Sequence, residues 1–138
     1  MTKTFLITAG ISGLIAVIMD AIGTYYLLGN LTPEHMVAFS TAIQMQMYHT
    51  LAILAITFFN RYVSRAIINA TYYFFLFGIL FFSFPVYINS TTEVTGINMG
   101  AFSFIAGIGS LLFLIGWINI IWSGIKYVHH KRSRKKNG

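Results

Sequence analysis

The chain has 138 residues, of which 57% are hydrophobic and only 9% are charged, and its mean hydropathy is +0.73. Soluble domains carry about 25% charged residues, so this composition excludes an ordinary soluble protein. The sequence contains no cysteine, which excludes disulfides, thiolate metal sites and cysteine nucleophiles. A net charge of +6 would suggest a nucleic-acid partner for a soluble protein, but here the position of the basic residues matters more.

Four apolar stretches, each long enough to cross a bilayer, fill most of the sequence. A hydrocarbon core of about 30 Å needs about 20 helical residues, and within it every backbone N–H and C=O must be paired inside the segment. The sequence therefore predicts an all-α membrane protein, a four-helix transmembrane bundle that forms one integral domain over residues 1–138. The expected spans are residues 4–28, 40–60, 66–88 and 101–127.

The first span carries small residues at intervals of four and three, which places them on one helical face with an acid. The set is Ala9, Gly13, Ala16, Asp20 and Gly23. Small residues on one face let membrane helices approach closely. We therefore expect Gly13 to pack against a neighbouring helix and Asp20 to point into the bundle. A cleavable signal peptide is the weaker alternative, because this apolar run is longer than a usual signal sequence and Asp20 interrupts it.

The second span is preceded by a helix start. Thr32 fits an N-cap, Pro33 fits the first helical position, and Glu34 suits the positive end of the helix dipole. From Pro33 the helical pattern continues to Asn60, a length of about 42 Å at 1.5 Å per residue. This length exceeds the hydrocarbon thickness. The sequence therefore predicts an interfacial extension at the N-terminal end of the second helix.

The fourth span has a small residue in each heptad, at Gly109, Gly116 and Ser123. Such spacing fits the left-handed crossing of about +20° that is common in membrane bundles. We expect this face to pack closely against another helix.

All nine Lys and Arg residues fall on one side of the four-span topology: before the first span, between the second and third, and around the end of the fourth. By the positive-inside rule, both termini are expected to be cytoplasmic, and we expect a bacterial inner membrane. The basic tail at residues 128–138 is expected to lie near anionic lipid, at about 1 kcal/mol per basic residue. A nucleic-acid patch is the less favoured interpretation of this tail, so no nucleic-acid partner is expected.

Six polar residues come out at similar depth when each span is counted at 1.5 Å per residue. They are Asp20, Gln44, Gln46, Ser83 and Ser110, with His49 one turn deeper. An ionisable residue at this depth is a functional hypothesis, since Asp20 must be protonated, partnered or wetted by a cavity. Gln46 and His49 are its candidate partners. The favoured interpretation is a structural hydrogen-bond cluster that sets helix register, and the alternative is a proton, ion or small-ligand site.

Metal and catalytic motifs are missing from the sequence. It has no His-Glu-x-x-His motif, no paired intramembrane carboxylates and no glycine-rich phosphate loop after a strand. His49 is the only histidine within a predicted span, whereas a membrane b-type haem usually needs two facing histidines. We therefore expect no enzyme activity, no cofactor and no metal.

The segment 44–54, QMQMYHTLAIL, resembles the "YQMYHxLALL" stretch of domain-of-unknown-function family 423, the UPF0382 small membrane proteins related to transmembrane protein 256. Residues 31–35 look like its "LSxEH" helix start, and residues 113–117 match its "FLxGW". Two departures stand out, because Asp20 replaces a small residue of the family pattern and Tyr25 replaces a histidine. The resemblance implies the same four-helix membrane architecture and carries no biochemical activity over.

Two functions from different classes fit these observations. The leading hypothesis is a non-enzymatic accessory or assembly component of a larger membrane complex, because small-residue helix faces offer docking surfaces and no soluble domain is present. Its partners would be the lipid bilayer and either another membrane protein or further copies of the chain. The alternative is a small oligomeric transporter or proton- or ion-coupled carrier that uses Asp20, by analogy of layout alone.

Overall fold

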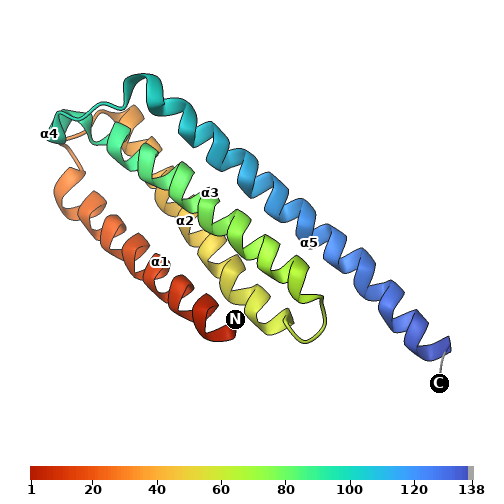
Figure 1. Cartoon of the computed structure of the whole chain (residues 1–138). Helices are drawn as coiled ribbons and strands as arrows, with labels where there is room; N and C mark the ends of the chain where they lie inside the picture. Colours follow the sequence, from red (N-terminus) through yellow and green to blue (C-terminus); the bar gives the residue numbers. More distant parts are fainter. Residues whose placement is uncertain (137–138) are drawn as a thin grey trace.

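Four long helices run up and down the molecule, and short connections join them (Figure 1). The computed structural model describes the backbone of residues 1–136 and the side chains of residues 1–127, and this part of the chain contains no strand. The long helices are α1 (Thr2–Ile22, continued by a π-helical turn at Gly23–Leu27), α2 (Pro33–Phe59), α3 (Arg65–Ser90) and α5 (Phe104–Lys136). The last connection holds α4 (Thr92–Thr95) and a 3-10 turn at Gly100–Ser103.

Each long helix is long and apolar enough to cross a membrane, which confirms the predicted all-α fold with four spans. The start of α2 also forms as predicted. Thr32 accepts a hydrogen bond from the backbone N–H of His35 at 3.3 Å, and Pro33 occupies the first turn. The helix is continuous from Pro33 to Phe59, so its length exceeds a bilayer core by several residues.

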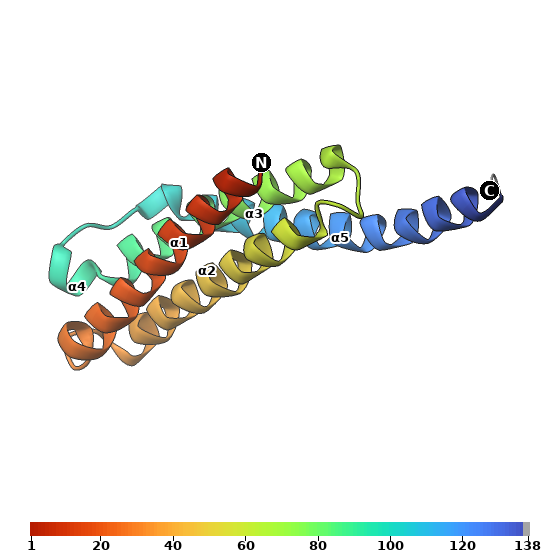
Figure 2. The same ribbon diagram turned by 90° about the horizontal axis from the view of Figure 1, so that it is seen from below.

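The helices are arranged with α2 and α3 in the middle. α1 packs chiefly on α2, and α5 packs chiefly on α3. Two ends of the bundle are distinguished below: the basic end, which holds Lys3, Arg61 and Arg65, and the loop end, which holds residues 28–32 and 91–99. At the basic end α5 extends beyond the other helices (Figures 1 and 2).

The core lies along the α2–α3 contact in two clusters. The larger one is nearer the basic end and gathers Phe5, Ala9, Ile53, Ile56, Ile68, Tyr72, Phe75, Ile79 and Phe113, whereas the smaller one near the loop end gathers Leu27, Phe39, Ala42 and Tyr87. Lipid tails are as apolar as these side chains, so close packing and not removal from water stabilises the contacts between the helices.

Close approach of α3 and α5 depends on three glycines. A Cβ added at Gly109 would overlap the backbone of Phe82, so the two backbones touch there. Gly116 lies under the ring of Phe75, which would be 2.5 Å from an added Cβ, and Gly78 lies under Phe113 in the same way. Each helix therefore places a phenylalanine ring over a glycine of the other.

The remaining small residues of the predicted packing faces are less tightly held. Gly13 of α1 faces Thr50 of α2, and a Cβ added to Gly13 would lie 3.6 Å from the Thr50 methyl group, which is ordinary contact. The hydroxyl of Ser123 donates to the Ile120 carbonyl of its own helix at 2.7 Å. The contact of α5 with α3 is thus closest at Gly109 and Gly116, whereas the contact of α1 with α2 at Gly13 is of ordinary closeness.

Candidate functional site

A buried polar network joins α1, α2 and α3 in the half of the bundle nearer the loop end. The amide nitrogen of Gln46 donates to the Ser12 carbonyl at 2.9 Å, and its amide oxygen accepts from the Tyr87 hydroxyl at 2.7 Å. The hydroxyls of Ser12 and Thr50 share a hydrogen bond of 2.7 Å. One turn nearer the loop end, the Ser83 hydroxyl donates to the Ala42 carbonyl at 3.1 Å. These bonds leave the network fully paired, so it holds three helices in one register.

His49 forms a separate polar contact between α2 and α5. Its Nδ1 lies 2.6 Å from the Met45 carbonyl, and its Nε2 lies 3.1 Å from the indole nitrogen of Trp117. Because an indole N–H only donates, Nε2 must accept, and the ring proton must therefore be on Nδ1. The imidazole also stacks on Phe113, with ring centroids 3.5 Å apart. Both ring nitrogens are occupied, so His49 holds helices together and has no lone pair left for a ligand.

Asp20 and Gln44 do not join these networks. Both side chains are exposed on the bundle surface, and neither forms a hydrogen bond within the part of the chain that the structure describes. The expectation that Asp20 points into the bundle is therefore wrong, and so is its proposed pairing with Gln46 or His49. The physical reason is helix rotation, because the buried strip of α1 is centred about 50° away from Asp20 at 100° per residue. That strip comprises Phe5, Ala9, Ser12 and Ala16.

The six predicted polar residues thus divide into four groups. Gln46 and Ser83 lie in the buried network, and His49 lies on the α5 side of α2. Asp20 and Gln44 face outward, while Ser110 is half-buried and donates to the Ala106 carbonyl of its own helix at 3.2 Å. Depth along a helix does not by itself separate inward from outward positions.

The sequence analysis missed Tyr87 and Trp117 as network members. Tyr87 had a usable signal, since it lies four residues after Ser83 and therefore on the same face of α3. No sequence signal indicated Trp117, because tryptophan in a membrane helix is typical of the interface and not of a buried hydrogen bond.

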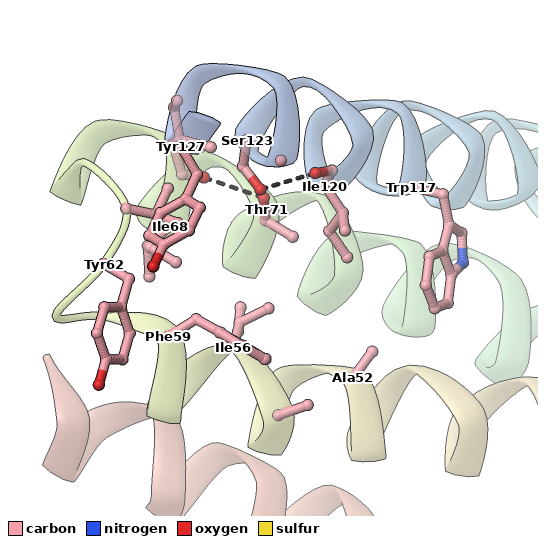
Figure 3. A pocket seen from close by; sticks show the side chains of 14 residues that line it. Ala52, Ile56, Phe59, Tyr62, Ile68, Thr71, Trp117, Ile120, Ser123 and Tyr127 are labelled. Carbon is pink, nitrogen blue, oxygen red and sulfur yellow. Dashed lines mark hydrogen bonds between the residues drawn. The ribbon is translucent and has the colours of Figure 1, made fainter. Parts of the chain in front are cut away.

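A lateral gap separates α2 from α5, because α5 packs on α3 instead. Toward the basic end this gap forms an apolar groove of about 550 Å³ (Figure 3). Its walls include Ala52, Ile56, Phe59, Ile68, Ile120 and Tyr127. A second cavity of about 620 Å³ lies toward the loop end and is lined by Met45, Tyr48, His49, Ser110, Phe113 and Trp117, among others. Trp117 lines both cavities, so its ring and its bond to His49 divide the gap in two.

An exposed hydrogen bond between His35 and Glu93 closes the loop end. The carboxylate of Glu93 in α4 lies 2.6 Å from Nδ1 of His35 and accepts from the backbone N–H of Thr32 at 3.4 Å. Loss of solvent around this carboxylate raises its pKa, but hydrogen bonds from its own backbone, from His35 and from Thr32 outweigh that effect. The pKa of Glu93 is therefore lowered.

Comparison with known proteins agrees with this architecture. The family model described as "Protein of unknown function (DUF423)" matches residues 19–110. The chain is similar to the UPF0382 membrane protein YwdK of Bacillus subtilis, with 32% identity over 91% of this chain and 99% of the relative. The UPF0382 membrane protein SERP0230 of Staphylococcus epidermidis is 33% identical over 91% and 98% of the two chains. A Haemophilus influenzae UPF0382 membrane protein is 28% identical over 91% and 97%.

No solved structure matches this chain. The match of the family model and the near-complete coverage of the relatives confirm the resemblance drawn from the tyrosine–histidine segment at residues 44–54. Together with four membrane-spanning helices, they identify an integral membrane protein, and the chain belongs to the DUF423 family of UPF0382 membrane proteins.

Proposed function

We propose that this protein is a non-enzymatic accessory or assembly component of a larger membrane complex. The observation that carries the proposal is the groove between α2 and α5. In a closed four-helix bundle the last helix packs on both neighbours, whereas α5 leaves its α2-facing side open over two cavities. An open side between two helices is suited to a further helix.

The lining of the groove supports a helix as its occupant. Ala52, Ala55, Ser123 and Gly124 all line it, and a Cβ added at Gly124 would meet nothing within 4 Å. Small residues let the backbone of a neighbouring membrane helix come close, and apolar walls suit its side chains. A hydrophilic substrate would find almost no polar partner there.

We favour this function over a transporter or proton-coupled carrier that uses Asp20. Among the described side chains, every buried nitrogen and oxygen has a hydrogen-bond partner, so the bundle interior offers no free polar group to a moving ion. Asp20 also lies on the outer surface, away from the Gln46 network. An exchange site normally lines a pathway through the protein.

We place the protein in a bacterial inner membrane with both termini in the cytoplasm, because its basic residues gather on that side of the topology. The basic tail at residues 128–138 lies outside the described side chains, and its proposed contact with anionic lipid rests on the sequence. A cysteine introduced at Asn98 should react with a membrane-impermeant thiol reagent in intact cells. One introduced at Ser133 should react only after permeabilisation, and the reverse pattern would overturn the orientation.

The accessory role is tested by filling the groove. We expect the wild-type chain, purified from its native membrane in mild detergent, to carry a stoichiometric partner protein. Gly124→Leu should release that partner without lowering the melting temperature, because the new side chain projects into open space. Gly10→Leu is the matched control, since Gly10 also has nothing within 4 Å but lies on α1. A wild-type chain that purifies alone would contradict the proposal.

A further inference from the structure

Two polar side chains on the surface of the bundle lie within membrane-spanning helices. Asp20 of α1 and Gln44 of α2 are both exposed, and neither is hydrogen-bonded within the described part of the chain. Polar groups that face lipid without a partner are costly, and membrane helices commonly pair such groups across an interface. The two residues therefore call for a partner outside the single chain.

The contacts between α1 and α2 place the two residues at nearly the same depth. Asn60 donates to Thr2 at 3.5 Å and Thr50 bonds Ser12 at 2.7 Å, so these antiparallel helices keep a constant register. In that register Asp20 lies level with residue 42 of α2. Gln44 is two residues farther along, which is about 3 Å along the helix axis.

Both side chains also face outward on the same side of the bundle, which is called the α1–α2 flank below. On α1, the edge that faces α3 is marked by Thr8, whose hydroxyl lies 2.7 Å from that of Tyr72. Asp20 is about 120° around the helix from Thr8, on the opposite edge of the α2-facing strip. On α2, Gln46 bonds Tyr87 of α3, and Gln44 lies two residues away and hence on the opposite side of the helix.

We propose that this α1–α2 flank is the interface of a homodimer in which Asp20 of each chain hydrogen-bonds Gln44 of the partner subunit. A two-fold axis along the membrane normal keeps equivalent residues at equal depth and makes every contact occur twice. The glutamine NH₂ of each chain donates to a carboxyl oxygen of the aspartate in the other chain. The symmetric contact thus pairs all four side chains.

A second copy of the chain is a better partner for Asp20 than a basic residue of the same chain. The nearest basic residue along α1 is Lys3, which is about 26 Å from Asp20 at 1.5 Å per residue. The acid and the amide are complementary to each other, and a two-fold contact requires no residue that the chain lacks. Neither Asp20 nor Gln44 lines the groove or the second cavity between α2 and α5, so the dimer does not depend on the proposed accessory function.

The first test measures dimer affinity of the full chain in lipid vesicles by energy transfer between labelled copies. Wild type should dimerise, and Asp20→Leu and Gln44→Leu should each weaken the dimer by about tenfold, as expected for lost interhelical hydrogen bonds in lipid. The double variant should be little weaker than either single one, because both remove the same bonds. Asp20→Asn should keep the dimer, since two amides also pair.

The second test uses single cysteines, for which the chain offers a clean background because it has none of its own. Val17→Cys lies on the Asp20 side of α1 and should form a disulfide between two copies on oxidation. Ile11→Cys is equally exposed but on the far side, and it should not. A monomeric wild type, an unchanged affinity of both leucine variants, or a Val17→Cys cross-link only to a different protein would overturn the homodimer.

Discussion

The two sides of α5 are built in opposite ways. Toward α3, Gly109 and Gly116 let backbone and ring atoms touch, and the Asn119 amide donates to the Thr71 hydroxyl at 2.8 Å. Toward α2, the helix leaves two cavities, and His49 bridges the gap between them through its hydrogen bond to Trp117 and its stacking on Phe113. The difference suggests that the first side maintains the fold and the second remains available to a partner. Four changes in the chain test that division.

The largest effect is expected at Gly109. Its Cα faces the Phe82 backbone, which cannot move aside as a side chain can, so Gly109→Ala should lower the free energy of unfolding in detergent by about 3 kcal/mol. Thermal unfolding followed by circular dichroism measures this loss. Gly107→Ala is the matched control on the same helix, since nothing lies within 4 Å of its added Cβ. Equal melting temperatures for the two variants would contradict a close α3–α5 contact.

Gly116 should show a smaller loss. Gly116→Leu pushes against the Phe75 ring, which can rotate or shift, so the expected destabilisation is about 1–3 kcal/mol. Ile118→Leu, on the exposed side of the same turn, should leave the melting temperature almost unchanged. If both variants melt like wild type, the small heptad face is not a packed interface.

The Trp117–His49 hydrogen bond across the gap should contribute less to stability than either glycine contact. Trp117→Phe removes the indole N–H and leaves Nε2 of His49 without its donor, which should cost about 1 kcal/mol of stability. The same variant should weaken partner retention, because the ring also separates the two halves of the gap. Trp122→Phe is the control, since Trp122 is exposed and lines neither cavity. Full stability of Trp117→Phe would show that this hydrogen bond does not hold α5 to α2.

The smallest effect is expected at the loop end, where Glu93 ties the start of α2 to the connection that leads into α5. Because the pKa of Glu93 is lowered in the folded protein, its pairing stabilises the fold above the carboxyl's ordinary pKa. That stability is lost as the pH falls through the lowered value. Melting temperature should therefore drop at acidic pH for wild type and less so for Glu93→Gln, with Glu34→Gln behaving like wild type. Superimposable acid curves would rule out a contribution from the hydrogen bonds of Glu93.

Several features of the fold follow from short stretches of sequence. Helix number and length are predictable because the bilayer thickness sets how many apolar residues a span needs. The start of α2 is predictable because Thr32 and Pro33 act through bonds within one turn. The heptad of Gly109 and Gly116 also indicated the close face of α5, since only glycine admits a touching helix.

The sequence by itself thus determined the four helices, the capped start of α2 and the family to which the chain belongs. Only the tertiary structure decided which side of each helix is covered, and Asp20 shows why. A rotation of about 50° moves that side chain from a helix contact to the lipid-facing surface, and helical periodicity is too coarse to resolve it. For the same reason the sequence did not predict the gap beside Trp117. Whether α5 packs on α2 or on α3 depends on the fit between whole helix surfaces and not on any single residue.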